Sequence, residues 1–195
     1  MTIREANFVV GFDMDGVLLD HTANKVAIAR EMGLTVLPEA THSEEIRSIF
    51  KDIEDYRRFQ GLLYYDHPIA LTVPLMPDVT VVLDRLVVDG TPFVLVSRRR
   101  DSEAAIRILK TQGLWGKYFS DKNAAFVPSV AEKVARAQSF GVTRYIDDER
   151  KVIRAMEGII AEPVLFDQHD RFGDTPHTRV RSWMEFLHLA SPVLR

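Results

Sequence analysis

The sequence contains no cysteine among its 195 residues. Disulfides, zinc–thiolate sites and thiol nucleophiles are therefore excluded together, and the absence fits a reducing compartment. No stretch approaches the roughly 18 consecutive apolar residues of a membrane-spanning helix. The N-terminus also lacks the apolar run and the small-residue cleavage site of a signal peptide. We therefore expect a cytoplasmic protein that does not bind membranes.

An excess of basic residues is also absent, since 25 Lys and Arg stand against 28 Asp and Glu and give a formal net charge of −3. A general polyanion binder needs such an excess to neutralise phosphates, so nucleic acid is not an expected partner. A small phosphorylated ligand needs only one or two local cations and stays compatible with this balance. The length suits one well-buried core with a modest insertion.

Short apolar, β-branched runs alternate with helical patterns along most of the chain. The predicted strands cover residues 8–12, 92–97, 144–147 and, with a weaker pattern, 162–167. The predicted helices cover residues 79–86, 101–112, 129–140, 150–156 and 182–189. This alternation is typical of βαβ units and predicts the α/β class, with a doubly wound parallel sheet of Rossmann-like type. Ligands of such sheets bind outside the carboxyl ends of the strands.

The segment from residue 21 to residue 74 interrupts that rhythm. It contains no good strand pattern and predicts helices near 22–32 and 43–59, with prolines at its exit. Because it directly follows the first strand, we expect a small helical cap over the strand ends. The predicted organisation is a core of residues 1–20 and 75–195 and a cap of residues 21–74.

Two carboxylates, Asp13 and Asp15, follow the first predicted strand and precede Gly16. Carboxylates this close repel one another unless a cation joins them or one keeps a proton. Oxygen ligands without neighbouring His or Cys favour a hard ion such as Mg²⁺. One carboxylate can then attack phosphorus and the other can transfer a proton. The alternative is a solvated turn.

A second pair of acids, Asp147 and Asp148, closes the third predicted strand. Adjacent acids make a poor core, but they can complete a magnesium site that the first loop cannot fill alone. Acids also suit a helix N-terminus, and both interpretations can hold at once. Ser97 ends the second strand, where its hydroxyl and backbone N–H can bind a phosphoryl oxygen.

Several cations follow these strands. Lys133 lies in the first turn of a predicted helix, where the macrodipole disfavours positive charge, so it suits a bound dianion or the carboxylate cluster. The alternative is a solvated surface lysine. Arg98 can point at a phosphate, whereas Arg99 and Arg100 are expected on a solvated face.

The histidines show no metal-ligand spacing, and we expect them on the surface or in loops. His21 alone is close enough to the first loop to lie near the site. The stretch 64–67, Tyr-Tyr-Asp-His, is a possible substrate contact, although aromatic residues at a helix end more often serve packing.

Taken together, these motifs resemble the haloacid dehalogenase-like (HAD) superfamily of phosphohydrolases. Residues 12–18, Phe-Asp-Met-Asp-Gly-Val-Leu, resemble its first motif, and residues 94–97, Val-Leu-Val-Ser, resemble its second. Lys133 stands at the place of the third motif's lysine. Residues 145–148, Tyr-Ile-Asp-Asp, resemble the paired-acid form of the fourth. The four motifs occur in the order of the family pattern and together span most of the chain.

The resemblance implies roles for these residues. Asp13 would be the nucleophile and Asp15 the acid/base, which favours phosphoryl transfer over dehalogenation. Magnesium would be held by the Asp13 side chain, the Asp15 backbone carbonyl and Asp148, with Asp147 as a ligand or directly behind one. Ser97 and Lys133 would hold the transferring phosphoryl group. The cap would close over the site and exclude water.

The sequence departs from the family pattern at two positions. Val134 follows Lys133, where many relatives have proline. The match of Lys133 to the third motif is therefore weaker than the matches of the other three motifs. Arg98 follows Ser97, where a small or amide residue is usual. An arginine there resembles some nucleotide and polynucleotide phosphatases.

The leading hypothesis is a magnesium-dependent phosphatase acting on a small phosphate monoester through an aspartyl phosphate. A phosphomutase shares the first half-reaction, and a non-catalytic module that binds metal or phosphate is the alternative from another class. The pattern leaves the substrate open, because specificity in a widely used fold depends on the cap and the loops. A homodimer also stays open.

Overall fold

The computed structural model describes residues 8–65 and 68–190, and its centre is a six-stranded parallel sheet with the order β3-β2-β1-β4-β5-β6. The strands are β1 (Val10–Phe12), β2 (Phe93–Ser97), β3 (Ala124–Phe126), β4 (Arg144–Asp147), β5 (Glu162–Phe166) and β6 (Thr178–Val180). The predicted doubly wound parallel sheet is confirmed. β1 lies between β2 and β4, where the strand order reverses direction.

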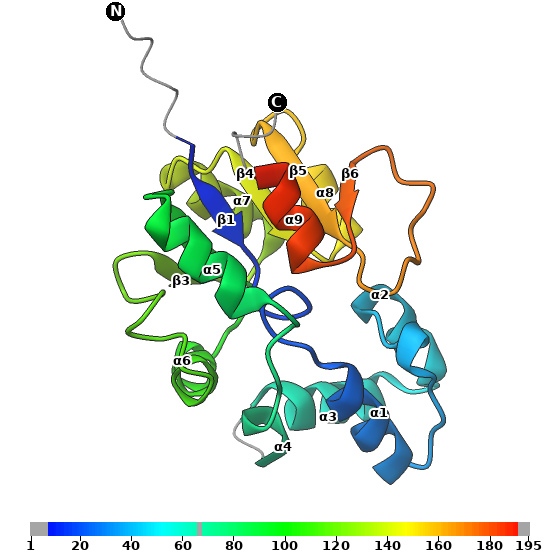
Figure 1. Cartoon of the computed structure of the whole chain (residues 1–195). Coiled ribbons are helices and arrows are strands. Elements are labelled where there is room, and N and C mark those ends of the chain that lie inside the picture. Colours follow the sequence, from blue (N-terminus) through cyan, green and yellow to red (C-terminus); the bar gives the residue numbers. More distant parts are fainter. Residues whose placement is uncertain (1–7, 66–67, 191–195) are drawn as a thin grey trace, which may run out of the picture.

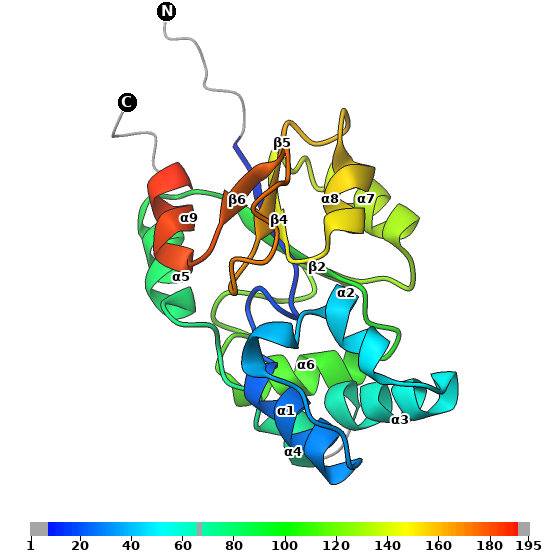
Figure 2. The same ribbon diagram turned by 90° about the vertical axis from the view of Figure 1, so that its right-hand side faces the viewer.

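Helices cover both faces of the sheet (Figures 1 and 2). One face carries α5 (Val79–Val88) and α9 (Trp183–Ala190), and the other carries α7 (Val130–Ser139) and α8 (Arg150–Met156). In β2, Leu95 belongs to the hydrophobic cluster under α5 and α9, whereas Val94 and Val96 belong to the cluster under α7 and α8. This alternation follows the two-residue period of a strand, and both sets are buried because both faces are covered.

Two strands were not predicted from the sequence. β3 and β6 have three residues each, and they are the two edge strands of the described sheet. Their residues, Ala-Ala-Phe and Thr-Arg-Val, give too short a pattern to distinguish a strand from a loop. The other strand and helix predictions outside residues 21–74 agree with the structure to within about two residues, α6 (Ser102–Thr111) among them.

Residues 22–71 form helices, turns and irregular loops, with no strand among the residues that the structure describes. The α-helices are α1 (Thr22–Glu31), α2 (Ser43–Ile46), α3 (Ile53–Tyr64) and α4 (Pro68–Leu71), with 3-10 turns at Pro38–Ala40 and Arg47–Ile49. The single helix predicted near 43–59 is wrong, because Phe50 is extended and the Asp52 side chain caps a new helix through the N–H of Glu54. This part has its own hydrophobic cluster, with Phe59 and Leu63 fully buried. Its status as a separate cap domain stays a prediction.

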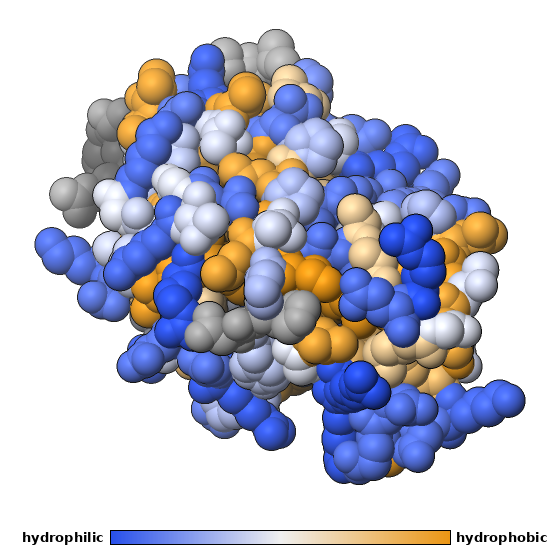
Figure 3. All heavy atoms as spheres, turned by 90° about the horizontal axis from the view of Figure 1, so that it is seen from below, coloured by the Kyte–Doolittle hydropathy of each residue, from blue (hydrophilic) through white to orange (hydrophobic). Residues whose placement is uncertain are grey.

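The helical part lies below the sheet in Figures 1 and 2, on the side of the strands' carboxyl ends. The face seen from below shows apolar residues near its middle and further apolar residues toward its edges, with hydrophilic residues between them (Figure 3). Within residues 8–65 and 68–190, no helix combines the length and the apolar character that crossing a membrane requires.

Candidate active site

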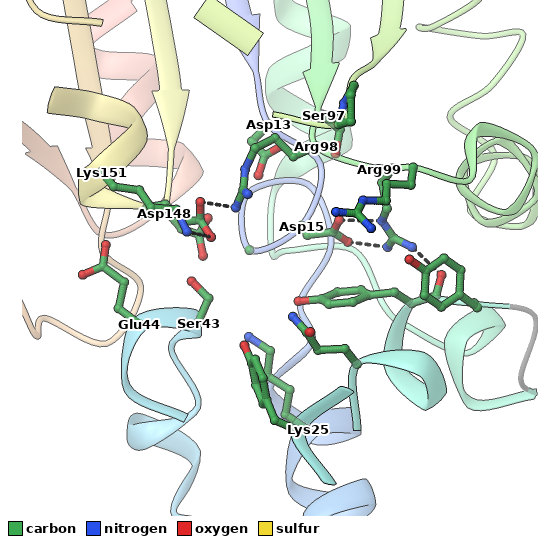
Figure 4. Close-up of a pocket in the computed structure, with 18 of the residues that line it drawn as sticks. Asp13, Asp15, Lys25, Ser43, Glu44, Ser97, Arg98, Arg99, Asp148 and Lys151 are labelled. Atoms are coloured by element: carbon green, nitrogen blue, oxygen red, sulfur yellow. Dashed lines mark hydrogen bonds and ion pairs between the residues drawn. The ribbon is translucent and has the colours of Figure 1, made fainter. Parts of the chain in front are cut away.

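The polar residues predicted from the sequence meet where the strand order reverses. Asp13 follows β1, Asp147 ends β4 and Ser97 ends β2, so the three strands deliver their side chains to one edge of the sheet. Figure 4 shows Asp13 and Ser97 at the strand ends, with Asp148 beside them. A crevice at such a reversal is the usual ligand site of an open α/β sheet.

The loop after β1 is folded tightly onto β4. The backbone N–H of Asp13 donates to the carbonyl of Ile146, and the carbonyl of Met14 accepts from two residues further along the loop. Gly16 has a positive φ of 78°, and a Cβ at this position would lie 2.5 Å from Oδ2 of Asp148. Only glycine allows both the backbone conformation and the close approach of Asp148.

Three buried carboxylates form a cluster that can hold a cation. Asp13, Asp147 and Asp148 each offer an oxygen within 4.8 Å of the other two. Burial and the neighbouring acids raise the pKa of Asp147 to about 7 and raise the pKa of Asp148 well above its ordinary value. Oδ1 of Asp13 is buried and accepts no hydrogen bond from any described residue. An all-oxygen donor set with this excess of negative charge fits a hard divalent ion such as Mg²⁺.

Lys133 reaches the same cluster from the first turn of α7. Its Nζ lies 2.8 Å from Oδ1 of Asp13, at an angle unsuited to a hydrogen bond, and donates to Oδ2 of Asp147 at 2.5 Å. The side chain is fully buried, and the two carboxylates outweigh the effect of burial and raise the pKa of Lys133 well above its ordinary value. The lysine is therefore charged and faces the carboxylates, and the solvated-surface alternative is wrong.

Asp15 is held away from the cluster by a buried arginine. Nε and one terminal nitrogen of Arg99 donate to the two oxygens of Asp15 at 2.7 and 2.6 Å. Arg99 also donates to the carbonyl of Tyr64, and its guanidinium lies 4.7 Å from the centre of that ring. The expectation that Arg99 lies on a solvated face is wrong, since only 4% of this residue is exposed.

His21 supplies a further donor to Asp15. Its Nε2 lies 2.6 Å from Oδ1 of Asp15, and the carboxylate is the acceptor. Although burial raises the pKa of Asp15, Arg99 and His21 outweigh it and hold that pKa far below its ordinary value. Asp15 is thus ionised in this arrangement. His21 lies in a loop and at the site, as its position after the first loop suggested, and it is buried there; His42, also in a loop, reaches the site as well, with its Nε2 2.9 Å from the carbonyl of Asp148.

Ser97 and Arg98 line the cavity in front of the cluster. Ser97 is buried, whereas Arg98 is partly exposed and pairs with Glu149. To bind an anion in the cavity, the Arg98 guanidinium must therefore either contact the anion and Glu149 together or break its ion pair with Glu149. Arg100 is exposed, as expected from the sequence, and lies at the rim of the same cavity.

The cavity has a volume of about 700 Å³ and lies between the strand ends and the helical part. The helical wall includes Lys25 from α1 and a row of polar and aromatic residues from α3. Glu44 of α2 accepts from the backbone N–H and from Nε of Arg150, both at 2.8 Å, and fastens the helical part to the core. Nothing in the sequence pattern indicated Lys25, because a single lysine in a helix is usually solvated. In the stretch 64–67, Tyr64 and Tyr65 line the cavity, and residues 66–67 lie outside the described residues.

The sequence matches no protein-family model and no curated protein. The structure, by contrast, is similar over nearly its whole length to several solved structures. A haloacid dehalogenase-like protein of unknown function from Agrobacterium tumefaciens has 19% identity and a TM-score of 0.64, over 93% of this chain and 96% of the other. A predicted phosphoglycolate phosphatase from Haemophilus somnus has 14% identity and a TM-score of 0.61, over 96% and 100%. A HAD-hydrolase from Bacillus subtilis bound to magnesium has 11% identity and a TM-score of 0.62, over 95% and 99%.

Proposed function

We propose that this chain, whose fold is that of the haloacid dehalogenase-like superfamily, is a magnesium-dependent phosphatase. It would hydrolyse a small phosphate monoester through an aspartyl phosphate. The observation that carries the proposal is the cluster of Asp13, Asp147 and Asp148 around the charged Lys133. Two neighbours of similar fold, a predicted phosphoglycolate phosphatase and a hydrolase bound to magnesium, support the reaction class and the ion.

Asp13 is the proposed nucleophile. One of its carboxylate oxygens forms a bond to phosphorus while the bond from phosphorus to the leaving oxygen breaks. Lys133 neutralises part of the charge of Asp13 and of the transferring phosphoryl group, and Ser97 and Arg98 donate hydrogen bonds to the phosphoryl oxygens. A water molecule then attacks the phosphorus, the bond between phosphorus and the Asp13 oxygen breaks, and inorganic phosphate leaves with Asp13 regenerated.

Asp13, Asp147 and Asp148, with the backbone carbonyl of Asp15, are the proposed magnesium ligands. When bound, magnesium supplies positive charge against the negative charge that gathers on the phosphoryl oxygens. With that positive charge in place, the three buried carboxylates would be ionised together, because their mutual repulsion would be offset.

Asp15 is the proposed acid/base. Its ionised state fits the second half-reaction, in which it takes a proton from the attacking water. Donation to the leaving oxygen in the first half-reaction requires a proton that Asp15 does not hold while Arg99 and His21 bind it. We therefore expect Asp15 to exchange at least one of these contacts when substrate enters.

The test is hydrolysis of a generic aryl phosphate by purified protein with magnesium, with chelator and with Asp13→Asn. We expect activity to disappear on chelation and to fall by at least about three orders of magnitude in Asp13→Asn, because the nucleophile is lost. Asp121→Asn, which changes an exposed acid on the core, is the matched control and keeps activity. Full activity of Asp13→Asn would overturn the proposal.

A further inference from the structure

A buried lysine, Lys25, lies in the wall of the cavity opposite the acidic cluster. It belongs to α1, only 7% of it is exposed, and its Nζ donates to the carbonyl of Thr41 at 2.9 Å. Within the part of the chain that the structure describes, no carboxylate lies within 4.0 Å of this nitrogen. Figure 4 shows Lys25 rising from α1 toward the cavity, with Asp13 and Ser97 on the far side.

A buried ammonium group without an ion-pair partner is costly. The nearest acids do not relieve that cost directly, because they are committed elsewhere. Asp15 is bound by Arg99 and His21, and Asp148 belongs to the proposed magnesium site. Burial accordingly lowers the pKa of Lys25, although Asp148 and Asp15 oppose that effect. The group that would pair with this ammonium is therefore an anion inside the cavity.

The rest of the helical wall suits a polar, small ligand. Tyr56, Gln60 and Tyr64 of α3 are spaced by four residues and line the cavity as one stripe. They offer hydroxyl and amide groups rather than a purely apolar surface. Arg57 lies beside them at the rim and is largely exposed. A ligand that reaches Asp13 with its phosphoryl group would point its other end at this wall.

We propose that Lys25 binds a second anionic group on the substrate, so that the preferred substrate is a small phosphate monoester whose leaving group carries a carboxylate or a second phosphate. This inference rests on the proposed phosphatase function and specifies its substrate class. Lys25 acts on the leaving group and is separate from the residues proposed to hold the transferring phosphoryl group, Ser97, Arg98 and Lys133.

The test compares esters that differ only in the second anion. Carboxymethyl phosphate is paired with 2-hydroxyethyl phosphate, and propane-1,3-diyl bisphosphate is paired with 3-hydroxypropyl phosphate. A charge-assisted hydrogen bond contributes enough for a preference of about 10- to 100-fold in kcat/KM. We expect the native protein to prefer the charged ester in one of the two pairs, and that pair identifies the second anion as a carboxylate or a phosphate. Lys25→Met should bring that ratio close to one, and Lys51→Met, an exposed lysine of the same helical part, should leave it unchanged.

Binding to Asp13→Asn protein makes the test independent of turnover. Calorimetric titration of the same four esters into Asp13→Asn, and into Asp13→Asn combined with Lys25→Met, should show the same loss of preference. If no ester is hydrolysed but the preference in binding depends on Lys25, the phosphatase proposal fails and the anion site stands. Equal affinity for the charged and neutral esters, or a preference that survives Lys25→Met, overturns the anion site.

Thermal unfolding with magnesium present separates binding from a structural role. Lys25→Met removes a buried charge together with one hydrogen bond, so the midpoint should stay level or rise. A large fall in the midpoint with an unchanged substrate preference would assign Lys25 to the packing of α1 against Thr41 and would overturn the proposal.

Discussion

The pair of Arg99 and Asp15 provides the sharpest energetic prediction. The guanidinium makes two hydrogen bonds to the carboxylate, at 2.7 and 2.6 Å, and 4% of the Arg99 side chain and 19% of the Asp15 side chain are exposed. Removing one partner of a buried ion pair leaves the other charge uncompensated and costs about 3–5 kcal/mol. Because Asp15 is partly exposed and keeps its bond from His21, we expect the lower end of this range for Arg99→Met.

Arg99→Met should therefore lower the free energy of unfolding by about 3 kcal/mol. For a chain of this length, that change corresponds to a fall in Tm of about 6–12 °C. The measurement is urea unfolding followed by circular dichroism, with chelator present so that bound metal does not add stability to either protein. Arg100→Met is the matched control, since the neighbouring arginine is exposed and its loss should change stability by no more than about 0.5 kcal/mol.

A double-mutant cycle decides whether the loss comes from this pair. Asp15→Asn should also destabilise, because it leaves the Arg99 guanidinium buried with a neutral partner. The double variant should then be more stable than the sum of the two changes predicts, with a coupling energy of about 2 kcal/mol. Additive effects, or a loss below about 1 kcal/mol in Arg99→Met, would refute the account of Asp15 as a carboxylate held by Arg99.

Three further predictions follow from the same geometry. Gly16→Ala should abolish magnesium binding measured by calorimetry, because its Cβ would lie 2.5 Å from Oδ2 of Asp148; affinity equal to that of the native protein would contradict this. Asp167 is buried, and hydrogen bonds from the N–H groups of Arg171 and Phe172 and from Arg179 outweigh burial and lower its pKa. The contribution of Asp167 to stability should thus be present above its ordinary pKa of about 4 and be lost as pH falls below that value. Urea unfolding should therefore show that Asp167→Asn loses less stability between pH 5 and pH 3 than the native protein does, and an equal loss in both proteins would contradict the assignment. Magnesium should raise the Tm of the native protein in a concentration-dependent way, and the rise should vanish in Asp148→Asn; an equal rise in that variant would place the ion elsewhere.

The strand ends could be predicted from the sequence because strand and site share one local signal. An apolar run that closes on acids, as at Asp13 and Asp147, indicates both a buried strand and its polar end. Parallel pairing then brings such ends together without further information. The same reasoning predicted Ser97 at the end of a strand and Lys133 in the first turn of a capped helix, and the structure brings both to the strand ends.

Arg99 and Lys25 could not be found in this way. Arg99 binds Asp15 across 84 positions of sequence, and the run Arg98–Arg100 gives no sign of which side chain turns inward. Lys25 is buried where the 3-10 turn at Pro38–Ala40 packs against α1, and its partner Thr41 directly follows that turn, in a segment without a regular pattern. Such contacts depend on how the helical part sits over the sheet, which hydrophobic periodicity does not encode.

Arg99 also connects the proposed chemistry to the position of the helical part. The same guanidinium donates to Asp15, in the loop after β1, and to the carbonyl of Tyr64, at the end of α3. A movement of α3 away from the sheet would break the bond to Tyr64 and open the buried pair to water, where an ion pair contributes much less to stability. Asp15 would then be easier to detach from Arg99. The position of the proposed acid/base would therefore depend on the helical wall that also carries Lys25, the proposed specificity residue, although no described residue of that wall belongs to the acidic cluster.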